Sequence, residues 1–129
     1  MSRASERGAV AVEFAIVAPL LVMLLLGIME FSRAYNAQAT LSAAAREGVR
    51  VMAISGQQTL AIGAAKNAAV SLSPTLKDTD IHFGTPCPST VASGTSPQIT
   101  ITITYSLSTM TGIAGPFAMT GKGAMLCGG

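Results

Sequence analysis

The chain has few of the residues that carry catalysis or bind nucleic acid. Of its 129 residues only 11% are charged, one is histidine, two are cysteine and none is tryptophan. A net charge of +2 is too small to indicate a nucleic-acid partner. The sequence contains no C-x-x-C pair, no G-x-S-x-G nucleophile motif and no P-loop. We therefore expect neither an enzyme nor a cofactor-binding protein.

One short motif bears on metal binding. Asp78, Asp80 and His82 alternate in "DTDIH" and would share one face of a strand. Such side chains can approach a metal ion, but the chain offers no further Cys, His or Glu cluster beside them. Alternation of polar residues on an exposed strand explains the pattern equally well, so we expect no metal site.

Apolar sequence, in contrast, is abundant near the N-terminus. Phe14–Met29 contains no charge and would form a helix about 24 Å long. Extending it to Ala9–Phe31 gives 23 residues, enough for a hydrocarbon core of about 30 Å. Arg3 and Arg7 precede the run and favour a cytoplasmic N-terminus. We predict a transmembrane helix over residues 9–31, with the C-terminal domain exported to an oxidising compartment.

Glu13 interrupts the start of this run, and three interpretations of the segment compete. A cleaved secretory signal has a short apolar region and a small-x-small site, whereas this run continues into an Ala-rich helix. A plain signal anchor is simpler and makes Glu13 a marker of the membrane interface. The third interpretation uses the spacing: Gly8 ends a charged leader, four apolar residues follow, and Glu13 and Phe14 come next.

That spacing, G-x-x-x-x-E-[FY] before a hydrophobic helix, resembles a class III, type IV-like prepilin signal. The longer stretch from Arg7 to about Ala53 is similar to the TadE family, the pilin-like proteins of the Tad/Flp (tight adherence) pilus system. Its most specific parts are "VEFAIVAPLL", "EFSRAY" and "AAREGVR". The C-terminal half resembles the family more loosely, through its two cysteines and a Thr-rich strand.

The resemblance implies a processing step and a set of partners. A prepilin peptidase would remove the leader, residues 1–8, by cutting between Gly8 and Ala9. Glu13 would become the fifth residue, beside Phe14, and its carboxylate could pair with the new amine of a neighbouring subunit. Such a pair offsets part of the cost of burying a charge and sets axial register. The implied partners are the peptidase, other pilin-like subunits and the inner-membrane Tad platform. The implied location is the bacterial inner membrane, then the pilus or cell surface.

The long helix is expected to continue beyond the membrane. Pro19 lies inside the apolar run and predicts a kink. Residues 32–55 contain no proline and predict an exported continuation that ends before Gly56. Apolar residues recur near helical spacing from Phe31 and Tyr35 to Met52, which predicts the packing face of this part.

Residues 56–129 predict a small α+β head, so that the whole fold is a pilin-like lollipop. Residues 57–73 suggest a second helix, with Leu60 and Leu72 on its apolar face. Short and weak strands are expected over residues 80–83 and 118–127. The clearest strand is expected over residues 98–107, where Ile and Thr alternate. Gly121 and Gly123 allow a bulge or a close backbone approach in the last strand.

The only two cysteines, Cys87 and Cys127, both fall in the head. If the head is exported, a disulfide between them is expected. It would close a loop of about 41 residues and stabilise the domain by roughly 4 kcal/mol in the chain-entropy model. The alternative is two free, buried thiols.

Two classes of function remain. The first is a pilin-like structural or assembly subunit of a Tad/Flp pilus, cleaved after Gly8. The second is an unprocessed single-pass protein that anchors a periplasmic or surface binding module. Cleavage at Gly8 distinguishes the two, because only the first class loses its leader.

Overall fold

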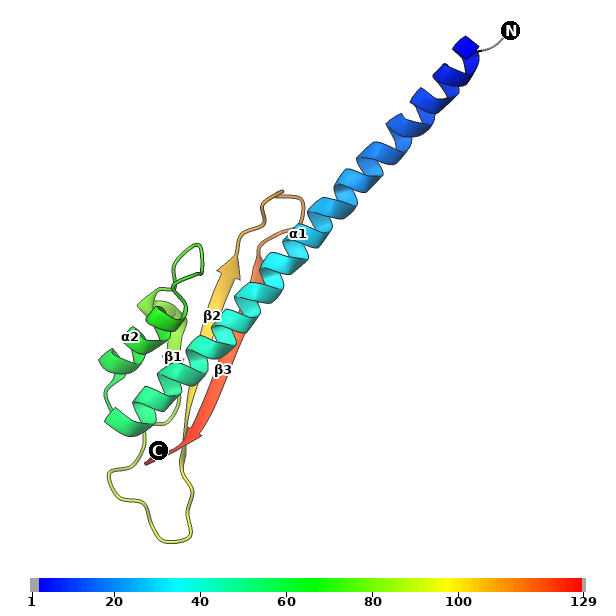
Figure 1. Cartoon of the computed structure of the whole chain (residues 1–129). Coiled ribbons are helices and arrows are strands. Elements are labelled where there is room, and N and C mark those ends of the chain that lie inside the picture. Colours follow the sequence, from blue (N-terminus) through cyan, green and yellow to red (C-terminus); the bar gives the residue numbers. More distant parts are fainter. Residues whose placement is uncertain (1–2, 129) are drawn as a thin grey trace. The chain divides into compact units, whose positions relative to one another are not determined.

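The structure is a computed structural model that describes residues 3–128, so residues 1–2 of the predicted leader and residue 129 of the predicted head lie outside the described part. Its elements are α1 (Arg3–Ser55), α2 (Gln58–Ala68), the 3-10 helix η1 (Asp78–Asp80), β1 (Ile81–Phe83), β2 (Gln98–Leu107) and β3 (Phe117–Leu126) (Figure 1). This confirms the predicted α+β class. The chain forms two compact units that divide between Arg33 and Ala34. The second unit contains the predicted head together with the part of α1 from Ala34 onward, and this whole unit is called the head below.

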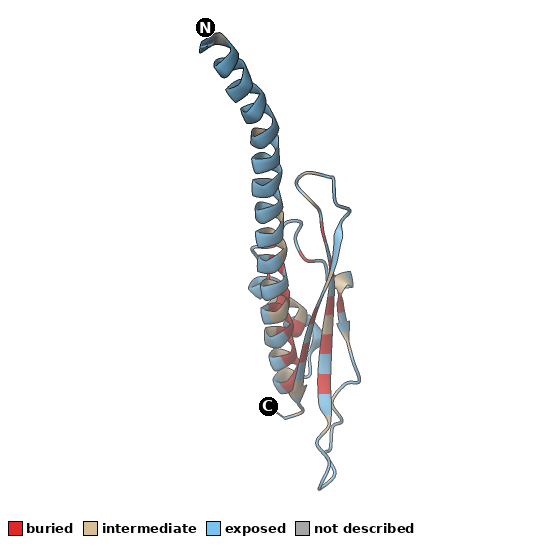
Figure 2. Ribbon diagram, turned by 90° about the vertical axis from the view of Figure 1, so that its right-hand side faces the viewer, coloured by how far each residue is buried: buried red, intermediate tan, exposed pale blue. Residues whose placement is uncertain are grey.

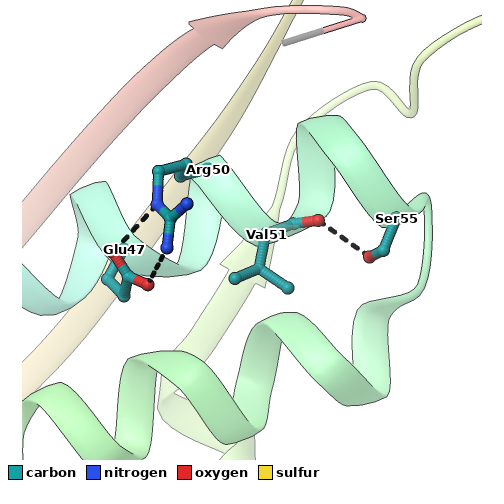
Figure 3. Close-up of polar contacts among 4 residues, drawn as sticks. All are labelled: Glu47, Arg50, Val51 and Ser55. Carbon is teal, nitrogen blue, oxygen red and sulfur yellow. Dashed lines mark hydrogen bonds and ion pairs between the residues drawn. The ribbon is translucent and has the colours of Figure 1, made fainter.

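Helix α1 is continuous through Pro19 and ends where the sequence indicates. At its C-terminus the Ser55 hydroxyl donates to the Val51 carbonyl at 2.7 Å (Figure 3). Gly56 follows with φ +66° and donates its amide to the Met52 carbonyl at 2.9 Å. A left-handed residue at this position satisfies a terminal carbonyl and stops the helix, and glycine adopts that conformation at little cost.

The head contains one antiparallel sheet of order β1-β2-β3. The pairing of β2 with β3 is unbroken from Gln98↔Leu126 to Leu107↔Phe117, so the glycines of β3 form no bulge. The odd-numbered residues from Ile99 to Leu107 are buried, and the alternating Thr and Ser residues lie on the other face. The predicted alternation of β2 is therefore confirmed.

The second half of α1 and the short helix α2 pack against the buried face of the sheet, and these three surfaces enclose the core (Figure 2). No polar or charged residue in the described part of the chain is buried. The head is therefore held by apolar packing. The buried residues are Ala37, Leu41, Ala44, Ala45, Val49, Met52, Ala53, Ala61, Ala65, Ala69, Leu72, Leu76, Ile81, Ile99, Ile101, Ile103, Tyr105 and Leu107.

The helix faces that pack into this core differ only in part from the predicted ones, because Leu41, Ala45, Val49 and Met52 of α1 are buried at the predicted spacing. Phe31 and Tyr35 are 75% and 70% exposed. On α2, Leu60 is 52% exposed, and Ala61 and Ala65 are buried in its place. Small side chains make up these contacts because they let the backbones of helix and sheet come close together. Helix α2 also ends at Ala68 instead of reaching residue 73.

Strand β3 shows how close this approach is. A Cβ atom added to Gly121 would lie 2.5 Å from the Leu41 carbonyl oxygen, and one added to Gly123 would lie 2.6 Å from that of Ala45. Both obstacles are backbone atoms of α1, which cannot rotate away as a side chain can. The two glycines therefore let the backbone of β3 lie directly against that of α1. This is the close backbone approach that the sequence analysis named as one of two possibilities for these glycines.

The structure confirms the predicted disulfide. Cys87 lies in the loop between β1 and β2, and Cys127 directly follows β3, with a Cα–Cα distance of 5.6 Å. The Cys127 amide also donates to the Pro97 carbonyl at 2.9 Å. The end of an edge strand is thereby linked to the loop that precedes the central strand.

We predict that Gly121→Ala and Gly123→Ala each lower the free energy of unfolding of the head by about 1–3 kcal/mol, because the new methyl group overpacks against the helix backbone. Chemical denaturation followed by circular dichroism measures this. Gly63→Ala is the matched control. It lies in α2 with no atom within 4 Å of the added Cβ, and alanine favours a helix by roughly 1 kcal/mol over glycine. Wild-type stability in both β3 variants would contradict the close approach.

Candidate membrane and assembly segment

The first unit exposes a long apolar surface. From Val10 to Phe31, 15 large apolar side chains are exposed. The helix is long and apolar enough to cross a membrane, and none of its most apolar stretch is buried (Figure 2). This segment, residues 9–31, is called the apolar segment below.

The apolar segment is apolar on every side. An amphipathic helix has one apolar stripe and one polar face, but residues 20–26 are large and apolar without interruption and point in all directions around the helix. Such a surface fits an environment that is apolar all round, either lipid or a bundle of similar helices.

Gly8 and Ala9 lie in the first turns of α1 and are exposed. A Cβ atom added to Gly8 would meet nothing within 4 Å, so packing within this chain does not require a glycine there. Gly8 is helical, however, whereas proteolysis generally needs an extended peptide. Glycine lowers the cost of unwinding such a turn because it disfavours a helix by about 1 kcal/mol relative to alanine.

Glu13 and Phe14 follow on the next turn, and both side chains are exposed. The helical neighbours of Glu13 at three and four residues are apolar, among them Ala9 and Ile16. Within the described part of the chain its carboxylate forms no ion pair. A carboxylate that leaves water at this position is costly unless it is paired or protonated.

Pro19 removes one hydrogen bond of the apolar segment. As an imino acid it cannot donate to the carbonyl of Ala15, four residues earlier. The α-helix nevertheless continues on both sides. The effect at this position is a locally weakened helix, and the predicted kink stays a prediction.

Charged pairs on α1 lie at the end of the apolar segment and within the head. Arg33 lies 3.8 Å from Glu30, near the point where the apolar run stops. Arg50 donates two hydrogen bonds to Glu47, at 2.6 and 3.1 Å (Figure 3). These hydrogen bonds and the charge of Arg50 lower the pKa of the Glu47 carboxyl below its usual value. This largely solvent-exposed pair leaves the second half of α1 charged on its outer side.

The residues of "DTDIH" do not come together around a site. Asp78 accepts a hydrogen bond from Lys66 at 2.7 Å, and Asp80 accepts the Lys77 amide at 3.0 Å. His82 lies 3.5 Å from the hydroxyl of Thr104. Among the residues that the structure describes, no group of three or more His, Cys, Asp or Glu is placed to hold a metal ion.

Two residues that connect the second half of α1 to the other elements of the head are not identified by the sequence. Gln38 donates its amide to the Thr120 carbonyl of β3 at 2.9 Å. A Cβ atom added to Gly48 would lie 3.2 Å from the side chains of Ala65 and Ile101. A glycine within an Ala-rich helix is a signal of close packing, whereas nothing in the sequence marks Gln38.

Comparison with known proteins gives one match. Residues 8–50 match the family model described as "TadE-like protein". Neither the curated proteins nor the solved structures contain a match to this chain. The matched region begins at Gly8, covers the whole apolar segment and continues into the half of α1 that packs in the head. The region from Gly8 to Arg50, one third of the chain, is therefore similar to the TadE-like family.

Proposed function

We propose that the chain is a pilin-like structural or assembly subunit of a Tad/Flp, type IV-like pilus. The observation that carries the proposal is one helix with two kinds of surface. Its first part exposes apolar side chains all round, with a single carboxylate near the start, and its second part forms the core of a disulfide-linked head. A pilus subunit needs both kinds of surface, because the first part of the helix packs among other helices and the second part belongs to a head that stays folded outside the membrane.

The proposed orientation has the N-terminus in the cytoplasm and the head exported. Arg3 and Arg7 support a cytoplasmic N-terminus, and the Cys87–Cys127 disulfide supports an oxidising compartment for the head. The 23 residues of the apolar segment span about 34 Å as a helix, which fits a bilayer core of about 30 Å. The protein would start in the bacterial inner membrane and later reach the pilus or cell surface.

Processing would occur between Gly8 and Ala9, by a prepilin peptidase at the cytoplasmic face. The first turns of α1 would have to unwind there. Gly8 lowers the free-energy cost of this unwinding and places no side chain next to the scissile bond. The products are a leader of residues 1–8 and a subunit with a new amine on Ala9. That amine is a cation at neutral pH.

Assembly would then use the new cation. Glu13 lies four residues after Ala9, about 6 Å further along the helix axis. In a helical bundle the Ala9 amine of one subunit would meet the Glu13 carboxylate of another, shifted by that distance. The pair removes an unpaired charge from an apolar bundle and thereby favours one axial register over others. Other pilin-like subunits and the inner-membrane Tad platform are the partners in this step.

The first prediction from this proposal concerns cleavage. Gly8→Arg is expected to keep its leader and to be lost from assembled material, because a long charged side chain next to the scissile bond obstructs the peptidase. Immunoblotting in the native host measures the length of the protein. Ser5→Arg is the control, since it adds the same charge three residues earlier and should be cleaved normally. Full cleavage of Gly8→Arg at wild-type yield would contradict the proposed site.

The second prediction concerns assembly after cleavage. Glu13→Ala should be inserted and cleaved like wild type but should co-purify poorly with the pilus machinery, because the Ala9 amine loses its partner. Glu13→Asp keeps the charge with a shorter reach and should be intermediate. Quantitative pull-down from detergent extracts measures this. Equal recovery of wild type and Glu13→Ala would rule out the pairing role.

A further inference from the structure

The loop between β1 and β2, residues 84–97, is longer than the fold requires. The two strands are antiparallel neighbours, and Phe83 pairs with Ile101. Antiparallel neighbours can be joined by a two-residue turn, yet 14 residues connect Phe83 with Gln98. Loops of this length without a helix or strand are uncommon in compact domains and are usually either functional or flexible linkers.

Both ends of this loop are fixed, and the part between them buries nothing. Near its start Cys87 forms the disulfide with Cys127, and at its end the Pro97 carbonyl accepts the Cys127 amide at 2.9 Å. Every residue from 88 to 96 is exposed, and the loop projects beyond the end of the sheet (Figure 1). Packing of the head therefore explains neither the length of the loop nor its composition.

The composition of the loop is that of a modified surface segment. Six of its 14 residues are Ser or Thr, three are Pro and none is charged. Segments rich in Ser, Thr and Pro are typical of regions that carry sugars on their hydroxyl groups. Such a segment has many acceptor oxygens and, with little apolar side chain to bury, stays on the surface.

A tight turn presents one of these hydroxyl residues at the tip of the loop. Thr95 donates its amide to the Ala92 carbonyl at 3.1 Å and its hydroxyl to the same carbonyl at 2.7 Å. Gly94 has a φ of +86° and occupies the third position of this turn, where a left-handed residue is often needed. Ser93 occupies the second position, at the corner of the turn, and is exposed.

We propose that Ser93, with Ser89 and Thr90 as neighbouring acceptors, carries a sugar linked through the hydroxyl oxygen. The proposal rests on the export of the head proposed above. The hydroxyl oxygen attacks the anomeric carbon of a sugar that is activated as a nucleotide or lipid diphosphate. A C–O bond forms, the bond between that carbon and the phosphate oxygen breaks, the hydroxyl proton passes to a base of the transferase, and the diphosphate leaves.

A neutral sugar fits this loop better than a phosphate group does. From Ile81 to Gly121 the sequence contains no Lys or Arg, so this stretch offers no cation to pair with a phosphate. A sugar needs only an accessible hydroxyl and free space around it. Space is present at the tip, because a Cβ atom added to Gly94 would meet nothing within 4 Å.

Intact-mass spectrometry of the full chain, purified from the native host, tests the proposal. We expect a mass that exceeds the mass of the polypeptide by one or more sugar residues. The excess should be lost in the triple variant Ser89→Ala, Thr90→Ala and Ser93→Ala. The matched control is the double variant Thr100→Val and Thr104→Val, which removes exposed hydroxyls from β2 and should keep the excess.

Three outcomes would overturn the proposal: a mass equal to that of the polypeptide alone, an excess that fragmentation identifies as a phosphate or a lipid, and an excess that persists in the triple variant. The same spectra separate this failure from that of the proposed function. A chain that begins at Ala9 and carries no sugar refutes the loop proposal and leaves processing intact. A chain that carries the sugar and keeps residues 1–8 supports the loop proposal and contradicts processing.

Discussion

The apolar side chains between Ala9 and Phe31 must be removed from water, and the described part of the chain does not cover them. Burying one large apolar side chain is worth roughly 1.5–3 kcal/mol, so 15 of them represent tens of kcal/mol. That exceeds the whole stability of an ordinary domain, about 5–15 kcal/mol. Lipid or neighbouring helices therefore have to cover these side chains.

The second half of α1 meets the opposite requirement, because it has to form the core of a small head. It does so through small residues and close backbone contact, with Gly121 and Gly123 of β3 against the carbonyls of Leu41 and Ala45. A small domain buries little apolar surface. The Cys87–Cys127 disulfide compensates by linking the end of β3 to the loop before β2. One helix thus serves a membrane or bundle with one half and a folded head with the other.

The sequence predicted those features that depend on local pattern. The alternation of Ile and Thr in β2, the end of α1 before Gly56 and the α+β class are confirmed, as is the disulfide. The misassigned features depend on distant partners. Leu60 is exposed because the face of α2 that meets α1 is made of alanines, and a periodic pattern cannot tell which apolar face will find a partner. The roles of Gly8 and Glu13 depend on other proteins and stay predictions.

We infer that this chain is a processed subunit rather than a permanently anchored module. The N-terminus of the wild-type protein, purified from native membranes and from sheared surface material, decides between the two. We expect a sequence that begins at Ala9 in the surface material, with the leader present at most in a membrane-bound precursor. A protein that keeps residues 1–8 in every fraction would instead be an unprocessed membrane-anchored binding module.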